Sequence, residues 1–433
     1  MSLPRTPLLM LAAAAVGVPL ALSSGTTFAA AGDVWAVSKE ASGISGRPTV
    51  PDGGGRAFFG SSATDVVGKD ANGAADAFWR RRDGVTTKIS TPPGGGDADG
   101  ASSDVQVSAD GKTVAFATDA SNLWNSDHNE KKDIYACTRT CFSVGWVARG
   151  MEPDGDSMHP RLSADSKWVA FASDASNWVK DDTNGVRDVF VANVRSGAVT
   201  RVSVSSSGAQ LGSPSDHPSI SADGQLVTFS TRGRAVPRDT NTWSDVYLRD
   251  LTAGRTSLVS QSRDEKIANR ASGSAAVAKR CLDGTCFPTV VFTSTASNLV
   301  GNDTNGVRDV FVRERGSTAR ISVSKKGVQG ARGEGSWGPS ISRDGRYVAF
   351  ASDADLTGIA AQASDQGQIL LRDRSNGSVR LLSGSGGVPG NGDSTAPSLS
   401  PNGKYAAFQS RATNLDTVTK DNHTWDVFVT TVY

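Results

Sequence analysis

The sequence predicts an all-β fold, a seven-bladed β-propeller of four-stranded antiparallel blades whose last blade is closed by the N-terminal strand. Three observations predict it: one pattern recurs seven times, each copy contains four strand-like runs, and the seventh copy lacks its fourth run. A phenylalanine marks each copy, and successive markers lie 55 to 63 residues apart, a period typical of repeat architectures. The markers are Phe59, Phe116, Phe171, Phe229, Phe292, Phe350 and Phe408.

The third copy shows the four runs most clearly. We expect its strands A to D at 160–163, 168–173, 189–193 and 199–204, with a long loop between strands B and C. The runs are short and rich in Val, Phe and Thr, which favours strands over helices. Four antiparallel strands per copy are typical of a propeller blade, whereas a solenoid repeat contributes one or two strands or a helix pair.

The two ends of the repeat region predict how the ring closes. The seventh copy begins at Pro397 and ends at Tyr433, directly after its strand C at 426–429. Residues 34–38, VWAVS, and the segment after them resemble the fourth run and following loop of copy three. We therefore expect the N-terminal strand to complete the last blade, because an open ring would leave exposed strand edges.

A turn motif recurs between strands A and B. Copies two, six and seven carry SADGKTVAF, SRDGRYVAF and SPNGKYAAF, and the Asp-Gly pairs are strong hairpin signals. The motif resembles the TolB-type, WD40-like propeller repeat, and the resemblance covers essentially all of residues 33–433. It implies the propeller fold rather than one function, since that family spans translocation-system proteins, peptidase propellers and many uncharacterised exported proteins. TolB itself resembles a two-domain protein with an α/β domain before its propeller, whereas we expect a stand-alone propeller here.

The first 31 residues have the pattern of a signal peptide. Arg5 provides the positive start, residues 8–22 the apolar run, and residues 29–31 a small-residue cleavage site. The apolar run is short and interrupted by Gly17 and Pro19, which disfavours a membrane anchor. We expect residues 1–31 to be removed and residues 32–433 to form a single propeller domain, secreted or retained in the periplasm or cell envelope, with no membrane span.

The charge balance gives no drive toward polyanions. The chain has 45 basic and 44 acidic residues, and removal of Arg5 leaves equal numbers of each. A neutral chain has no general attraction to nucleic acid or anionic membranes. We expect a monomer that does not bind nucleic acid.

The four cysteines form two local pairs, each of which brackets an expected hairpin turn. Hairpin partners lie about 5 Å apart at Cα, within reach of a disulfide. Zinc is the alternative, but the pairs fall in different copies and two ligands make a poor zinc site. Because export favours disulfides, we expect two structural ones. The pairs are Cys137 with Cys141 and Cys281 with Cys286.

The loops between strands B and C carry the pattern D-x-N-x-x-x-D in five copies. Oxygen-rich loops of this kind are candidate calcium sites, although the glycine and the terminal glutamate of an EF-hand-like loop are missing. The alternative, which we favour, is that the Asp and Asn side chains bond their own backbone and start strand C. We expect no other cofactor. The candidate calcium ligands are Asp182, Asn184 and Asp188 in copy three, and Asp303, Asn305 and Asp309 in copy five.

The residue preceding strand A forms a second candidate site, at the mouth of the central channel. In four consecutive copies this residue is Arg47, Asp104, His159 or His217, whereas copies six and seven have Gly338 and Ala396. Two histidines and an aspartate resemble a metal or acid–base set. The alternative is a solvated polar rim. The change of residue from copy to copy favours function, since structural positions should repeat.

These features favour a non-catalytic binding scaffold over an enzyme. Long B–C loops lie on one face, conventionally the top, where we expect a protein or carbohydrate to bind. These loops also carry tryptophans, a residue type enriched at recognition surfaces. The alternative is a lyase or hydrolase at the channel mouth, although G-x-S-x-G and H-E-x-x-H motifs are absent. The loop tryptophans are Trp124, Trp178, Trp243 and Trp425.

Overall fold

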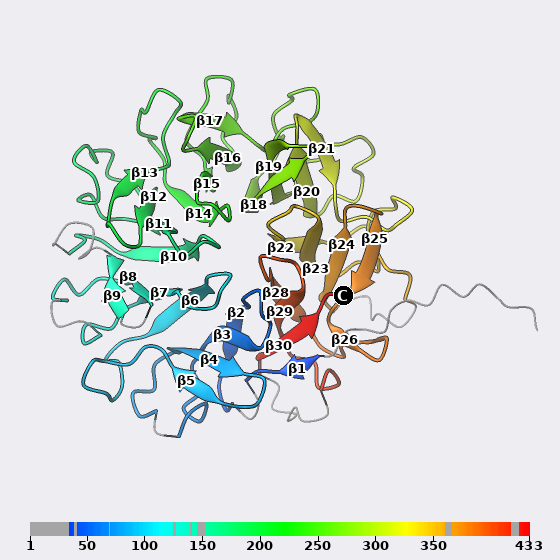
Figure 1. The fold of residues 1–433 in the computed structure, drawn as a ribbon. Helices are drawn as coiled ribbons and strands as arrows, with labels where there is room; N and C mark the ends of the chain where they lie inside the picture. Colours follow the sequence, from blue (N-terminus) through cyan, green and yellow to red (C-terminus); the bar gives the residue numbers. More distant parts are fainter. Residues whose placement is uncertain are drawn as a thin grey trace, which may run out of the picture. The chain divides into compact units, whose positions relative to one another are not determined.

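A computed structural model describes most of the expected propeller (Figure 1). The predicted signal peptide at 1–31 lies outside the described residues. No helix among the described residues is both long enough and apolar enough to span a membrane. The described residues are 34–38, 41–68, 70–123, 127–138, 141–144, 152–359, 366–416 and 424–433, without the side chains of 141 and 142.

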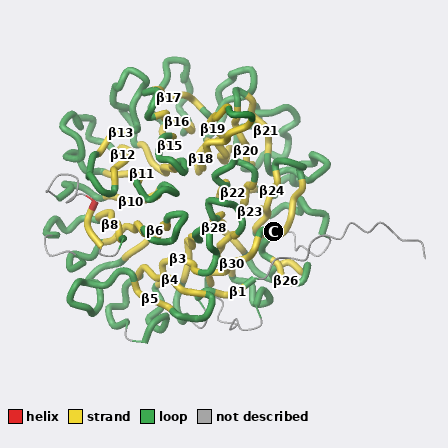
Figure 2. Tube along the Cα trace, in the orientation of Figure 1, coloured by secondary structure: helices red, strands yellow, loops and turns green. Residues whose placement is uncertain are grey.

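Seven four-stranded antiparallel sheets form a ring, which confirms the predicted seven-bladed propeller (Figures 1 and 2). Each sheet is named here from strand A to strand D. Blade 1 comprises β2 (Ser45–Thr49), β3 (Arg56–Ser61), β4 (Asp76–Arg81) and β5 (Thr86–Lys88). Blade 2 comprises β6 (Ser102–Val107), β7 (Val114–Thr118), β8 (Asp133–Cys137) and β9 (Cys141–Ser143). Blade 3 comprises β10 (Ser157–Leu162), β11 (Trp168–Ser173), β12 (Asp188–Asn193) and β13 (Val199–Arg201).

The remaining blades follow the same order. Blade 4 comprises β14 (Ser215–Ile220), β15 (Leu226–Thr231), β16 (Asp245–Asp250) and β17 (Arg255–Leu258). Blade 5 comprises β18 (Ser272–Leu282), β19 (Thr285–Ser294), β20 (Asp309–Glu314) and β21 (Ser317–Arg320). Blade 6 comprises β22 (Ser336–Ile341), β23 (Tyr347–Ser352), β24 (Gln368–Asp373) and β25 (Ser378–Leu381), followed by a small hairpin of β26 (Gly384–Ser385) and β27 (Val388–Pro389). Blade 7 comprises β28 (Ser394–Leu399), β29 (Tyr405–Ser410), β30 (Asp426–Thr431) and β1 (Trp35–Ala36).

The N-terminal strand closes the ring as predicted, although it is shorter than residues 34–38. Strand β1 is antiparallel to β30, with Trp35 opposite Val429. The contact continues beyond the strand, because Val37 N donates to Val427 O at 2.7 Å. The Ser38 hydroxyl then donates to Asp426 Oδ1 at 2.7 Å. The first and last blades are thereby held together by backbone and side-chain hydrogen bonds.

The marker phenylalanines form the core of each blade. All seven have 0% of their surface exposed. In six blades the marker stacks on the aromatic residue opposite it in strand C, with ring centroids 5.6 to 6.0 Å apart. In blade 6 Phe350 lies opposite Leu370 instead. The apolar face of each sheet packs on its neighbours, so the repeated phenylalanine reports a buried position between blades.

A bulge interrupts strand A in all seven blades at the same point. In blade 3 the register of β10 on β11 shifts between Met158 and Arg161. The residue inside the shift, His159, has a φ of 53°, in the left-handed region that side chains rarely adopt. The equivalent residues have φ between 46° and 59°: Arg47, Asp104, His217, Ser274, Gly338 and Ala396.

Strand A begins earlier than the sequence predicts. The candidate mouth residues were expected to precede strand A, but they lie inside it, because strand A begins two residues before each of them. The structure also identifies the member from blade 5, Ser274, which the cysteine-containing insertion concealed in the sequence.

One cysteine pair is a disulfide in the described structure. Cys281 and Cys286 are joined across the turn between β18 and β19, with their Cα atoms 4.0 Å apart. Cys137 is also disulfide-bonded and lies opposite Cys141 in the β8–β9 register. The side chain of Cys141 is outside the described part of the chain.

Candidate binding site at the channel mouth

The strand A bulges place their side chains around a central cavity of about 500 Å³. The structure brings together the four residues that the sequence singled out, Arg47, Asp104, His159 and His217, as adjacent members of this ring. The other three members, Ser274, Gly338 and Ala396, are small. The mouth therefore carries ionisable side chains along blades 1 to 4 and small neutral ones along blades 5 to 7.

His159 is held by a carboxylate that sequence analysis missed. Its Nδ1 lies 2.7 Å from Asp216 Oδ1, which also accepts a hydrogen bond from the backbone N of His217 at 2.6 Å. Arg187, from the B–C loop of blade 3, donates to the second oxygen of Asp216 at 3.0 Å. Burial opposes ionisation of Asp216, but the hydrogen bonds from His159 and His217 hold its pKa far below the usual range. The only feature of the sequence that could have indicated Asp216 is its position directly before His217.

The two histidines lie against each other. Their rings are stacked at 20° with centroids 5.2 Å apart. Burial and the positive charges of His159, Arg161 and Arg47 lower the pKa of His217, although Asp216 opposes this effect. A neutral His217 imidazole beside a carboxylate-bound His159 could accept or donate a proton to a bound ligand.

Asp104 and Arg47 form an ion pair between blades 2 and 1. Asp104 is only 8% exposed, whereas the Arg47 side chain extends toward solvent. Burial raises the pKa of Asp104, but the charges of Arg47 and Arg161 outweigh burial and lower it overall. Asp104 is therefore a carboxylate at neutral pH.

A second ring of side chains lies two residues further along each strand A. Six of its members are neutral, and blade 3 contributes the only charge, Arg161. The residue after each member of this ring is apolar and lines the same cavity. The second ring consists of Thr49, Gln106, Arg161, Ser219, Ala276, Ser340 and Ser398.

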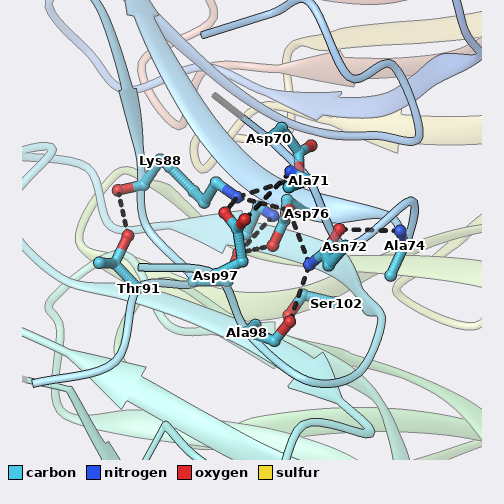
Figure 3. Close-up of polar contacts among 12 residues, drawn as sticks. Asp70, Ala71, Asn72, Ala74, Asp76, Lys88, Thr91, Asp97, Ala98 and Ser102 are labelled. Carbon is cyan, nitrogen blue, oxygen red and sulfur yellow. Dashed lines mark hydrogen bonds and ion pairs between the residues drawn. The ribbon is translucent and has the colours of Figure 1, made fainter. Parts of the chain in front are cut away.

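Side chains of the B–C loops bond both their own backbone and other segments of the same blade. In blade 1, shown in Figure 3, the Asn72 side chain donates to Ala98 O at 2.8 Å and accepts from Ala74 N at 2.8 Å. Lys88, from strand D, reaches back into this loop. Its Nζ lies 2.9 Å from Asp76 and 3.3 Å from Asp70. The lysine therefore neutralises both loop carboxylates.

An arginine does the same at both candidate calcium sites. In blade 3, Arg201 lies 3.4 Å from Asp182 and 3.7 Å from Asp188. In blade 5, Arg320 contacts Asp303 at 3.2 Å and Asp309 at 3.1 Å. The asparagines donate to the strand C aspartates, Asn184 to Asp188 at 2.8 Å and Asn305 to Asp309 at 3.0 Å. A guanidinium thus lies at the carboxylates where a calcium ion would bind.

Blades 2 and 4 replace this cation with a tyrosine hydroxyl. The strand D residue there is Ser143 or Leu258. The strand C aromatic opposite it is a tyrosine, and Tyr135 OH donates to Asp127 at 3.2 Å. Tyr247 forms the matching hydrogen bond to Asp239. Among the described residues, no group of three or more His, Cys, Asp or Glu side chains is arranged to hold a metal ion.

The loop tryptophans differ in exposure. Trp178 is 2% exposed and packs against Phe171 and Phe190, so it is a core residue. Trp243 is 48% exposed. The guanidinium of Arg411 lies over the Trp425 ring, with its Cζ 4.7 Å from the ring centroid. Trp124 is outside the described residues.

No protein-family profile matches the chain, and no curated protein sequence matches it. Solved structures do resemble it. An oligogalacturonate lyase in complex with manganese covers 93% of this chain and 98% of its own, at a TM-score of 0.53 and 11% identity. An oligogalacturonate lyase from Vibrio parahaemolyticus aligns over 93% of this chain and 99% of its own length, with a TM-score of 0.50 and 12% sequence identity.

TolB proteins are also among the similar structures. TolB from Acinetobacter baumannii covers 82% of this chain and 76% of its own, at a TM-score of 0.38 and 15% identity. At these identities a likeness establishes the fold alone. The ring of seven four-stranded blades makes this chain a seven-bladed β-propeller, and its repeat motif resembles the TolB-type repeat.

Proposed function

We propose that the protein is an exported, non-catalytic scaffold that binds a protein or carbohydrate ligand at the top face, with the channel mouth as the centre of the contact. One observation carries this proposal: the seven bulge positions are equivalent in backbone, yet they differ in side chain. The marker phenylalanines repeat because they are structural. The bulge side chains change around the ring from Arg47 and Asp104 to the histidine pair His159 and His217, and then to three small residues, although all seven share one backbone conformation.

The backbone at these positions supports the same proposal. A left-handed conformation costs a non-glycine residue on the order of 1–3 kcal/mol, and such strain clusters at functional sites. Glycine would avoid this cost, yet only blade 6 has glycine, Gly338. The B–C loops contribute to the site through Arg187, which supports Asp216. The Cys281–Cys286 disulfide favours an oxidising compartment outside the cytoplasm.

A second candidate function is a lyase or hydrolase at the same mouth. The hydrogen-bonded pair of His159 and Asp216 favours it, because a carboxylate that orients an imidazole is a common arrangement in acid–base catalysis. The oligogalacturonate lyases among the similar structures make oligogalacturonate a substrate to test.

The experiment is a binding screen against peptide and oligosaccharide arrays, oligogalacturonates included. Wild-type protein is compared with a His159→Ala/His217→Ala variant and with Lys112→Ala, a control in an exposed A–B turn on the opposite face. We expect binding that the double variant loses and the control keeps. Equal binding by all three proteins, or no binding across the arrays, would overturn the scaffold proposal. Turnover of a bound oligosaccharide that disappears in the double variant would establish the enzyme instead.

A further inference from the structure

We propose that Arg161 is the anchor of an anion site inside the channel, and that it takes the carboxylate of a small organic ligand. The inference rests on the proposed function of the channel mouth and names the chemistry that the ligand presents there.

The first observation is the isolation of this charge. Arg161 is the single charged member of the second ring, which is otherwise made of Thr, Gln, Ser and Ala. The register confirms its place, because Arg161 lies opposite Ala170 just as Ser340 lies opposite Ala349 in blade 6. Nothing in the blade fold requires an arginine here, since six other blades are built without one.

The second observation is that no carboxylate of the described residues contacts Arg161, although the charges of Asp104 and Asp216 act on it through space. Among the described residues Arg161 forms no salt bridge, and its one hydrogen bond runs from Nη1 to Pro160 O at 2.9 Å. The nearby carboxylates bind other cations: Asp104 pairs with Arg47, and Asp216 with Arg187 and His159. A guanidinium has five N–H donors in a planar fork, so most of its donors remain available within the cavity.

The third observation is the composition of the cavity, which selects the ligand class. Its volume of about 500 Å³ suits a small organic molecule. One unpaired guanidinium matches one negative charge, and its fork matches the two oxygens of a carboxylate. Neutral hydroxyl and amide groups surround it, and the apolar ring beyond accommodates a neutral or apolar body. A polyanion would need more unpaired cations than this channel offers.

The test titrates acetate, and acetamide as its neutral isostere, into the full protein while the imidazole NMR signals of His159 and His217 are followed. These rings line the same cavity as Arg161, and its charge acts on His217. His128, exposed on a B–C loop, serves as the internal reference. We expect saturable shifts of the two channel histidines with acetate and none with acetamide.

The matched variants use residues that other blades already carry at this level. Serine is the equivalent residue in blades 4, 6 and 7, and glutamine is the equivalent residue in blade 2. Because the fold already accepts both residues at this level, at least one of Arg161→Ser and Arg161→Gln should fold. Both should raise the Kd for acetate at least tenfold, while Lys112→Ala, in an exposed A–B turn outside the cavity, should leave it unchanged. Equal acetate binding by the arginine variants, equal responses to acetate and acetamide, or equally strong binding of chloride would each overturn the proposal.

Two further arms distinguish the source of the carboxylate. Trialanine is compared with its C-terminal amide, and glucuronate with glucose, to separate a peptide C-terminus from a sugar acid. The outcome is separable from that of the array screen. If the arginine variants keep acetate binding while the double histidine variant loses its array ligand, the scaffold stands and the anion site fails. If the screen finds no ligand but acetate binding depends on Arg161, the anion site stands alone.

Discussion

His159 Nδ1 lies 2.7 Å from Asp216 Oδ1, so a histidine of blade 3 is oriented by a carboxylate of blade 4 that is 57 residues away in sequence. The same carboxylate binds Arg187 at 3.0 Å. The Asp216 carboxylate therefore links His159 at the channel mouth to Arg187 in a B–C loop.

We expect Asp216→Asn to destabilise the protein by about 1–3 kcal/mol, because Arg187 and His159 lose a charged acceptor. The pKa of Asp216 is held below its usual value, so the stability it provides is present at neutral pH and is lost as pH falls through the acid range. Urea unfolding at pH 7 and pH 3 measures both effects. Asp174→Asn, at the more exposed end of the Arg187 contact, should cost about 1 kcal/mol or less. An equal loss for both variants would contradict the central role of Asp216.

Replacing Arg201, the buried cation of blade 3, should strongly lower the free energy of unfolding. Arg201→Leu leaves Asp182 and Asp188 buried without a cation, which typically costs about 3–5 kcal/mol. Adding Phe190→Tyr transplants the blade 4 arrangement of Leu258 and Tyr247, and we expect it to restore part of the loss.

Urea unfolding of the single and double variants measures this rescue. Arg255→Leu, at an exposed position in β17, is the control and should change stability by no more than about 0.5 kcal/mol. A double variant no more stable than Arg201→Leu would show that the tyrosine hydroxyl does not substitute for the cation.

Blade 2 should make stability depend on pH in the opposite direction. Burial, and then the charge of Asp127, raises the pKa of Asp133 to about 7, and its Oδ1 has no hydrogen-bond partner. A raised pKa means that the folded state holds this proton more tightly than the unfolded state. The stabilisation is complete below the ordinary value of 3.8 and is lost as pH rises through about 7.

Asp133→Asn should therefore raise the melting temperature at pH 8 and flatten its dependence between pH 5 and pH 8, since each unit of pKa difference corresponds to about 1.4 kcal/mol. Asp188→Asn, where Arg201 faces the carboxylate, is the matched control and should lower the melting temperature at pH 8. An unchanged slope in the Asp133 variant would contradict the assignment.

Ring closure should depend on the short N-terminal strand. Val37 is 0% exposed, so Val37→Asp places an unpaired charge between the first and last blades. We expect a loss of about 3 kcal/mol or more and faster proteolysis of blade 7. Ile44→Asp, at a position 59% exposed, should leave both unchanged. Equal behaviour of the two variants would mean that closure contributes little to stability.

Calcium binding by the loops of blades 3 and 5 stays a prediction that a chelator tests. Because Arg201 and Arg320 already contact both carboxylates of their loops, we expect the same melting temperature in excess EGTA and in millimolar calcium. A rise of several degrees with calcium, absent from Asp182→Asn, would show that the ion displaces the arginine.

The sequence by itself determined the architecture. Seven copies, four strands per copy and closure by the N-terminus follow from local signals, since the alternation of buried residues and the Asp-Gly turns act within one hairpin. The same locality explains why strand β11 matches its predicted bounds, 168–173, without error. It explains only part of the D-x-N-x-x-x-D loops, because each asparagine oxygen accepts from backbone two residues away, as in Asn72 and Ala74, whereas its amide nitrogen also donates to a distant segment, as Asn72 does to Ala98 O.

Only the tertiary structure decided which charges meet. Asp216 and Arg187 support His159 from a neighbouring blade and a loop, and Arg161 is alone because the carboxylates nearest to it bind other cations. The side chain of the left-handed bulge residue has no sequence signature, since Arg47, His159 and Ala396 share the bulge without sharing chemistry, although a proline follows this residue in five of the seven blades. These relationships depend on the closed ring, which brings residues about one repeat apart into contact; the local pattern of a single blade contains no information about its neighbour's side chains.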